Sequence, residues 1–270
     1  MADLAIGITG AAGRMGRALI CAAHEAAGCH VAAASERAGQ AALGQDAGTL
    51  AGLEALGIAV VADAAQLFAA AGAVLDFTAP VACVTHAALA AETGTIFITG
   101  TTGLDAAQQE AIALAAQKTV VVQAPNFSVG VNLALALTEQ AARVLDDSFD
   151  IEIVEMHHRH KVDAPSGTAL GLGRAAAAGR GVDLDKVSQR GRDGITGERK
   201  PGTIGFASLR GGDVIGDHTA VFAGAGERIE ITHKAGGREI FAAGAVRAAL
   251  WAVGKKPGLY SMQDVLGFTR

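Results

Sequence analysis

The chain has 270 residues, a length that suits two domains, and 50% of them are hydrophobic, with 36 glycines but only one tryptophan. A net charge of −5 argues against a nucleic-acid partner, because phosphate binding requires a basic surface. The apolar runs end well before the ~20 residues that a membrane span needs, and the chain does not start like a signal peptide. Three cysteines without CxxC spacing indicate reduced thiols, so we expect a cytoplasmic α/β enzyme.

The first predicted elements form the context of a dinucleotide site. Residues 4–9 are an apolar strand candidate that runs into a glycine-rich turn, and residues 17–23 are helical in composition. Glycines let the backbone approach a pyrophosphate that lies against the start of a helix. The spacing is GxxGxxG, not GxGxxG, so a tight turn without a ligand is the alternative. The candidate contacts in this loop are Gly10, Ala11, Ala12, Gly13, Arg14 and Met15.

The second strand candidate, residues 29–35, ends at Glu36 and Arg37. An acid about 20 residues after the glycine loop is placed to bind the ribose hydroxyls of the adenosine. Arg37 could instead face a 2′-phosphate. The pair predicts NADH or NADPH as cofactor and leaves two alternatives open, use of both or a preference for one.

Strands and helices continue to alternate along the first half of the chain. Strand candidates are residues 57–61, 73–78, 95–99 and 119–123, and the helical segments between them are 64–71, 81–91 and 105–117. This order predicts a Rossmann-like, doubly wound parallel sheet, in which ligands bind beyond the carboxyl ends of the strands. The candidate residues in the loops at these ends are Gly100, Thr101, Thr102, Ala124, Pro125, Asn126 and Phe127.

A second domain with a different pattern is predicted over residues 127–237. An amphipathic helix at 129–145 precedes residues 150–155, which alternate polar and apolar as a half-buried antiparallel strand does. Further strand-like runs are 205–209, 218–223 and 227–233, with a long exposed loop at 190–202. We therefore expect an α+β domain with a mixed or antiparallel sheet. A helix at about 239–253 returns the chain to the first domain, which comprises 1–126 completed by 238–270.

Charge is concentrated in one short segment of this otherwise weakly charged chain. His157, His158, Arg159, His160 and Lys161 are consecutive, and a Pro-Ser-Gly-Thr turn follows at 165–168. Crowded cations repel one another, so the cluster is explained best by an anion bound among them. Ser166 or Thr168 is expected near the N-cap of a helix, whose free backbone N–H groups form a second anion receptor. Two receptors predict a small ligand with more than one carboxylate or phosphate.

The histidine cluster has two other interpretations. A zinc site needs three or four ligands that converge on one point, whereas on a strand His157 faces away from His158 and His160. Arg159 and Lys161 also add positive charge where a cation would sit, so we expect no metal. A solvated basic loop is the other alternative. An imidazole, with its pKa of ~6.5, is suited to donate a proton near neutral pH.

Residues 155–170, with their spacing intact, closely resemble the signature of the dihydrodipicolinate reductase family, and the resemblance extends over the whole chain. It implies NAD(P)H-dependent reduction of 4-hydroxy-tetrahydrodipicolinate to tetrahydrodipicolinate, with loss of water, in bacterial lysine and diaminopimelate biosynthesis. It also implies a homotetramer formed through the sheet of the second domain. The implied catalytic residues are His157, as proton donor, and Lys161, which holds or polarises the substrate. The implied substrate contacts are His158, Lys161, Ser166, Gly167, Thr168 and Thr102. The implied cofactor contacts come from Arg238, Phe241 and the loops at 100–102 and 124–127.

Some alternatives stay open at this point. The residues themselves do not exclude an exchange of roles between His157 and His158. An amino-acid dehydrogenase built on the same two-domain plan would use a different substrate. A regulatory protein that senses NAD(H) without turnover would explain the glycine loop and Glu36, but it would leave residues 157–168 without a purpose.

Overall fold

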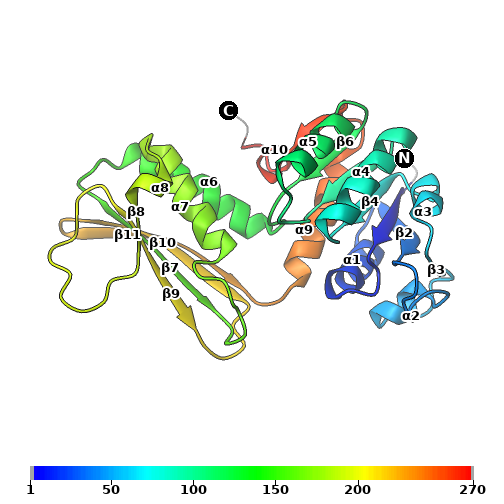
Figure 1. Ribbon diagram of the computed structural model, residues 1–270, viewed down its shortest axis with the longest axis horizontal. Helices are drawn as coiled ribbons and strands as arrows, with labels where there is room; N and C mark the ends of the chain where they lie inside the picture. The colour runs from blue at the N-terminus through cyan, green and yellow to red at the C-terminus, as the bar shows by residue number, and fades with distance from the viewer. Residues whose placement is uncertain (1–2, 269–270) are drawn as a thin grey trace. The chain divides into compact units, whose positions relative to one another are not determined.

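The computed structural model describes residues 3–268, and the chain forms two compact units (Figure 1). Unit 1 contains the residues up to Val129 together with those from Arg238 onward, and unit 2 contains Gly130–Gly237. No helix in the described part of the chain is long and apolar enough to cross a membrane. Each unit has its own sheet and its own hydrophobic core.

Unit 1 is built on a seven-stranded sheet in the order β12-β6-β5-β4-β1-β2-β3, and every neighbouring pair is parallel. This is the strand order of the dinucleotide-binding doubly wound fold with one strand added at the β6 edge. The strands are β1 (Leu4–Thr9), β2 (Cys29–Ser35), β3 (Val60–Val61), β4 (Ala73–Asp76), β5 (Ile96–Thr99), β6 (Val120–Gln123) and β12 (Gly258–Tyr260).

Helices cover both faces of this sheet, which explains why its strands are apolar on both sides. The helices are α1 (Arg14–Glu25), α2 (Ala47–Ala51), α3 (Ala64–Ala70), α4 (Pro80–Thr93), α5 (Ala106–Ala115), α9 (Glu239–Ala252) and α10 (Met262–Val265). On β4, Leu75 belongs to the core shared with α1 and α9, whereas its neighbour Val74 belongs to the core shared with α3, α4 and α5. Successive side chains of a strand point to opposite faces of the sheet, so they pack into two different cores.

Unit 2 contains a mixed five-stranded sheet in the order β11-β10-β7-β9-β8. Its strands are β7 (Asp150–His157), β8 (Ser188–Arg190), β9 (Ile204–Arg210), β10 (Gly216–Gly224) and β11 (Glu227–Ala235). β7 is antiparallel to β10 and parallel to β9. Alternate residues of β7 are buried, beginning with Ile151, and this single-sided burial is the pattern expected of a sheet covered on one face.

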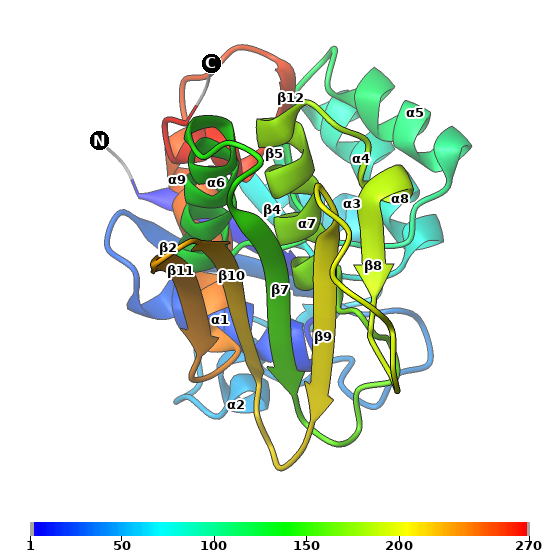
Figure 2. The same cartoon turned by 90° about the vertical axis from the view of Figure 1, so that its left-hand side faces the viewer.

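The covered face of the second sheet packs against helices (Figure 2). These are α6 (Val129–Val144), α7 (Gly167–Arg180) and the short α8 (Leu184–Val187). The side chain of Ser166 caps α7 by accepting a hydrogen bond from the Ala169 N–H (3.2 Å), and Gly181 ends the helix with φ +67°. Of the two N-cap candidates in the sequence, Ser166 is therefore the one used.

The predicted fold class, a Rossmann-like parallel sheet with a second mixed-sheet unit, is confirmed. Several strands are shorter than predicted, notably β3, which has two residues instead of the five at 57–61. The sequence reading also missed the short elements α2, α8, β8, β12 and α10. Each of these has three to five residues, too few for a periodic pattern to be visible.

Candidate active site

The glycine loop brings the start of α1 close to the end of β1. Gly10 has φ +63°, a conformation that favours glycine, and its carbonyl accepts a hydrogen bond from the Gly13 N–H (3.0 Å). A Cβ on Gly16 would lie 2.1 Å from the Gly10 oxygen, so only glycine allows this approach. The N-cap of α1, Gly13, offers no side-chain cap, which leaves the first-turn N–H groups available to an anion.

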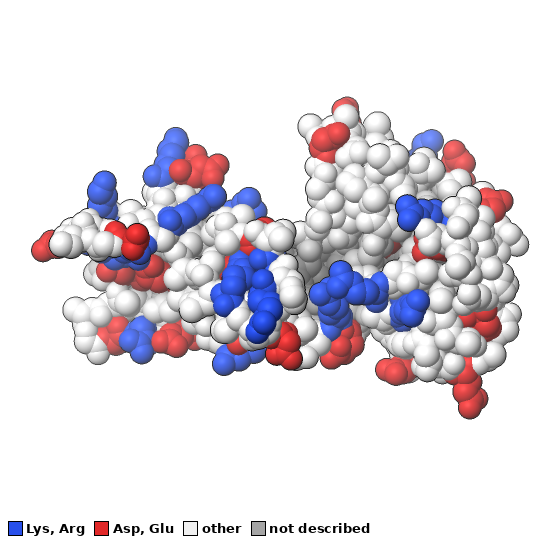
Figure 3. All heavy atoms as spheres, turned by 60° about the horizontal axis from the view of Figure 1, so that its bottom comes forward, with Lys and Arg blue, Asp and Glu red and all other residues white. Residues whose placement is uncertain are grey.

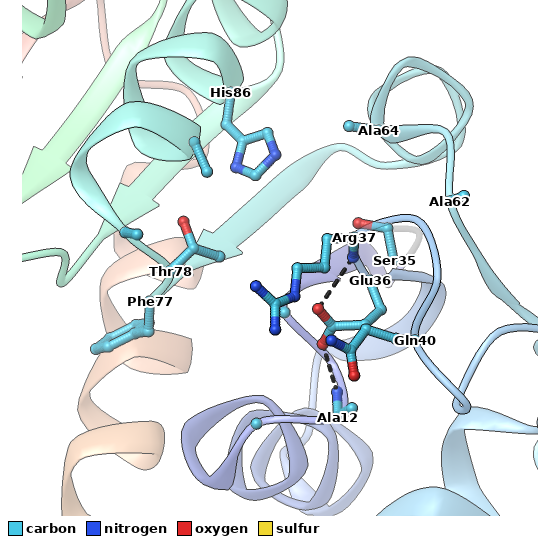
Figure 4. A pocket seen from close by; sticks show the side chains of 14 residues that line it. Ala12, Ser35, Glu36, Arg37, Gln40, Ala62, Ala64, Phe77, Thr78 and His86 are labelled. Carbon is cyan, nitrogen blue, oxygen red and sulfur yellow. Dashed lines mark hydrogen bonds between the residues drawn. The ribbon is translucent and has the colours of Figure 1, made fainter.

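A cavity of about 510 Å³ opens beside this loop (Figure 4). Gly10, Ala12 and Gly13 line it on one side, with Glu36 and Arg37 at the end of β2. The Glu36 carboxylate accepts hydrogen bonds from the backbone N–H groups of Ala12 (3.1 Å) and Arg37 (3.0 Å). Glu36 is thus held in place by the backbone of the loop that it adjoins.

Arg37 is held by a residue that the sequence reading did not single out. With the Gln40 amide oriented so that its oxygen faces Arg37, that oxygen accepts from Nε (2.8 Å) and Nη2 (2.9 Å). The Arg37 guanidinium lies in the cavity. Glu36 is beside it on the same wall, and Thr78 lies on the opposite wall (Figure 4). Gln40 therefore orients the one positive side chain of this wall.

A buried carboxylate, Asp76, lies behind the wall of the cavity that faces Glu36. The sequence reading also missed this residue. Asp76 is fully buried at the end of β4 and accepts hydrogen bonds from the hydroxyls of Thr9 (2.9 Å) and Thr101 (2.9 Å). The His86 Nδ1, on α4, lies 2.5 Å from its Oδ2. Burial alone would raise the pKa of Asp76, but the hydrogen bonds from His86, Thr101 and Thr9 hold it below its usual value. An ionised carboxylate thus ties the ends of β1, β4 and β5 together.

Several of the predicted cofactor-binding residues do not line the cavity beside Glu36. Ala11, Ala124 and Phe127 are buried in the core of unit 1. A Cβ on Gly100 would lie 2.1 Å from the Phe77 ring, so this glycine makes room for a cavity-lining aromatic residue. Arg238 lines a different cavity, of about 850 Å³, formed by residues of α1 and α9. The structure does not bring these residues to the cavity beside Glu36.

The cavity beside Glu36 fits the adenosine and phosphate portion of a dinucleotide. Its glycines leave no side-chain bulk at the uncapped start of α1, where a pyrophosphate is favoured by the helix dipole. Its far end offers one fixed carboxylate, Glu36, which suits ribose hydroxyls.

In unit 2, a buried carboxylate holds His157. Glu155 and His157 occupy alternate positions of β7 on its covered face and are 1% and 8% exposed. The His157 Nδ1 lies 2.5 Å from Glu155 Oε2, and the Arg210 guanidinium binds both oxygens of Glu155 at 2.9 Å. Burial opposes ionisation of Glu155, but Arg210 and His157 hold its pKa below the usual value. The ionised carboxylate therefore accepts, and Nδ1–H of His157 donates.

The start of α7 lies next to this pair. The Ser166 N–H donates to the Glu155 carboxylate (3.3 Å), and the Ser166 hydroxyl is 3.0 Å from Nε2 of His218 on β10. The rings of His218 and His157 are in edge contact, with centroids 5.0 Å apart. Burial, and secondarily the charge of His157, lowers the pKa of His218 to about 4, so this histidine is neutral at pH 7. His218 is a further residue that the sequence reading missed.

The cationic segment itself forms a loop beyond β7. Lys161 pairs with Asp163 (2.8 Å), and its backbone N–H donates to the His158 carbonyl (3.1 Å). The rings of His158 and His160 lie 6.2 Å apart, and His158 Nδ1 is buried with no hydrogen-bond partner among the described residues. Within residues 3–268, no three His, Cys, Asp or Glu side chains are grouped to hold a metal ion. On the face drawn in Figure 3, Lys and Arg occur in small groups among Asp and Glu.

Together, the parallel sheet with its uncapped glycine loop and the buried Glu155–His157 pair are features of a dinucleotide-dependent oxidoreductase. Family models described as the N- and C-terminus of dihydrodipicolinate reductase match residues 4–127 and 130–266. The chain belongs to the dihydrodipicolinate reductase family.

Individual proteins agree with this assignment. A 4-hydroxy-tetrahydrodipicolinate reductase of Rhodopseudomonas palustris (strain BisA53) is 58% identical over 99% of this chain and 98% of its own. The enzyme of the same name from Parvibaculum lavamentivorans is 58% identical over 98% of each chain. The solved structure of a dipicolinate-bound dihydrodipicolinate reductase from Paenisporosarcina sp. TG-14 has a TM-score of 0.78 at 23% identity and covers 97% of this chain and 98% of its own, which shows the shared fold.

Proposed function

We propose that this protein reduces 4-hydroxy-tetrahydrodipicolinate to tetrahydrodipicolinate, with loss of water, in lysine and diaminopimelate biosynthesis. The observation that carries the proposal is the buried Glu155–His157 pair beside the Ser166-capped start of α7. It combines a proton donor with a receptor for a carboxylate. The names of the curated relatives support the same reaction. A bound NADH or NADPH supplies the hydride.

His157 is the proposed general acid, because negative charge that develops on the substrate ring must be neutralised by a nearby proton. Since Nδ1–H is committed to Glu155, Nε2 is the nitrogen that gains and releases this proton. Burial lowers the pKa of His157 despite the opposing effect of Glu155. A dianionic substrate bound nearby raises that pKa again, so His157 becomes protonated when substrate is present.

The two substrate carboxylates have separate proposed receptors. The backbone N–H groups at the start of α7, with Ser166, Gly167, Thr168 and His158, bind one of them. Lys161 binds the other, exchanging its ion pair with Asp163 for one with the substrate. Asp163 is 56% exposed, so it is easily solvated when Lys161 leaves it.

The proposed cofactor is either NADH or NADPH. Glu36 accepts hydrogen bonds from ribose hydroxyls but repels a 2′-phosphate, whereas Arg37 attracts that phosphate. Both side chains line the same cavity, and each is fixed by neighbours. If the repulsion of a 2′-phosphate by Glu36 and its attraction by Arg37 are similar in size, the enzyme accepts both cofactors.

We further propose a homotetramer assembled through the face of the unit 2 sheet that its own helices leave uncovered (Figure 2). The strand register places Met156 beside Leu209 and Val154 beside Thr219 on that face. Leu209 is 49% exposed, and burial of this apolar stripe against another copy would stabilise the assembly. We place the enzyme in the cytoplasm, where its three cysteines, all free in the structure, would stay reduced.

A coupled assay tests the reaction, with the preceding synthase generating the unstable substrate in place and oxidation of the nicotinamide followed by absorbance. His157→Gln is expected to lower kcat by about 100-fold or more with a much smaller change in KM. Lys161→Ala should impair both parameters. His160→Gln, in the same cluster but exposed, is the matched control and should retain activity. Mild and equal effects of the His157 and Lys161 changes would refute these roles.

A further inference from the structure

Glu155 connects His157 to the start of α7 and to Arg210 in the proposed substrate site of unit 2. It is 1% exposed, and its two carboxylate oxygens accept from His157 Nδ1, from both terminal nitrogens of Arg210 and from the Ser166 N–H. Arg210 in turn donates to the Asp163 carbonyl (2.6 Å), so the loop that carries Lys161 is anchored to the same group. A buried carboxylate with this many donors is fixed in position.

We propose that Glu155 is the positioning residue of the reaction: it fixes which nitrogen of His157 donates the proton. It also holds that nitrogen beside the backbone N–H groups at the start of α7, which would bind a substrate carboxylate. This inference rests on the proposed function and adds a role for a residue that need not touch the substrate. Its partner Arg210 keeps the carboxylate ionised, so the Nδ1–H bond is maintained throughout the cycle.

The charged and titratable groups around His157 determine how removal of Glu155 should act. Besides Glu155 on β7, they are Arg210 on β9, His218 on β10 and Lys161 in the loop after β7. Glu155 is the only anion among these four, and the two cations lower the pKa of His157. Without the Glu155 charge, the imidazolium loses its counter-charge, and the pKa of His157 must fall further.

A purely structural role for the Glu155–Arg210 ion pair makes different predictions. If the pair only stabilised the fold, its removal would lower stability and the amount of active enzyme. It would not change the pH profile of the remaining activity. It would also act independently of His157, so its effect would persist when His157 is replaced.

The experiment is a double-mutant cycle with pH profiles. Glu155→Gln should lower kcat by about 10- to 100-fold, as loss of an orienting partner does. The KM for the nicotinamide cofactor should stay unchanged. The alkaline fall in kcat/KM should begin at lower pH, because less His157 is protonated. In a His157→Gln background, the same change should have almost no further effect. The matched control is Glu139→Gln on α6, which also removes a carboxylate paired with an arginine in unit 2 and should leave kcat and the pH profile unchanged.

The outcomes separate this inference from the proposed function. A wild-type pH profile and kcat in Glu155→Gln, alongside an inactive His157→Gln variant, would overturn the positioning role and leave the function intact. Absence of turnover in the wild-type enzyme would overturn the proposed function itself. Should Glu155→Gln fail to fold, the variant Glu155→Gln/Arg210→Gln, which leaves no unpaired buried charge, takes its place. If both variants are unfolded, Glu155 is structural and the inference is wrong.

Discussion

Gly216 faces Nε2 of His157, the nitrogen that we propose donates the proton. The two residues lie on the neighbouring antiparallel strands β10 and β7, and a Cβ on Gly216 would be 2.9 Å from Nε2. The backbone of Gly216 does not have a positive φ, so its conformation does not require glycine. What requires glycine is the space in front of Nε2, where an atom of the substrate would have to approach.

Gly216→Ala is therefore expected to impair catalysis while leaving the fold intact. The methyl group would crowd His157 Nε2, and kcat should fall by about 10-fold or more, as expected when a proton donor is displaced. Steady-state kinetics with a circular dichroism check on folding measures this. Gly211→Ala is the control, because its Cβ would meet only the flexible end of Met156, at 3.3 Å. Equal activity of the two variants would contradict the argument.

Because of the hydrogen bonds that it accepts, Asp76 is expected to contribute strongly to the stability of unit 1. Asp76→Asn should lower the free energy of unfolding at pH 7 by about 2–4 kcal/mol, because the partly buried His86 loses its charged partner. The folded-state pKa of Asp76 is depressed, so its contribution is present above the unfolded pKa of about 3.9 and is lost as pH falls through the folded pKa. The difference between variant and wild type should thus shrink in acid.

Chemical denaturation followed by the fluorescence of Trp251, the single tryptophan, reports on unit 1 directly, since Trp251 lies on α9. The exposed Glu110 on α5 offers a matched control, and Glu110→Gln should change stability by less than about 0.5 kcal/mol. A constant difference between Asp76→Asn and wild type from pH 7 to pH 3 would show that ionisation of Asp76 is not the cause.

Cofactor choice should depend on Arg37 and on the residue that orients it. Arg37→Ala should weaken NADPH binding by about 10- to 100-fold, the value of one or two charged hydrogen bonds, and leave NADH within a few-fold. Gln40→Ala should shift the preference in the same direction but less, because the guanidinium loses its orientation and keeps its charge. Dissociation constants from calorimetry or fluorescence titration test both. If Arg37→Ala weakens both cofactors equally, Arg37 has a structural role.

If the uncovered face of the unit 2 sheet is the assembly interface, a single charge placed on it should prevent assembly. Leu209→Glu places a carboxylate on the uncovered side of the unit 2 sheet, where burial against another copy would cost several kcal/mol. Size-exclusion chromatography with light scattering should then show a smaller particle. Val144→Glu, at the 78% exposed end of α6, should leave the mass unchanged. An unchanged mass in the Leu209 variant would exclude this face as the interface.

Long periodic segments made the fold predictable from the sequence. β2 has the residues 29–35 that the sequence predicts, and α9 begins at Glu239 as expected. In unit 2, the alternation over 150–155 correctly indicated a strand buried on one face. These elements are long enough for the period of burial to appear in the residue types.

The partners of the site residues were harder to predict, because they come from distant parts of the chain. Arg210 reaches Glu155 from 55 positions away, and His218 reaches Ser166 from 52. One signal was available: Glu155 occupies an inward position of β7, two residues before His157, so a carboxylate was bound to be buried beside that imidazole. For Asp76, a residue in a buried apolar strand, only the assembled sheet reveals the hydroxyls and imidazole around it.

The order of strands in unit 1 has a consequence for synthesis of the protein. β12 pairs with β6, and α9 contributes the fully buried Ala242, Ala245 and Ala249 to the core that α1 shares, yet both elements follow unit 2 in the chain. A ribosome therefore releases all of unit 2 before the first sheet can be closed. Until α9 emerges, a nascent chain carries an uncovered apolar face over β4, β5 and β6, the kind of surface that chaperones bind.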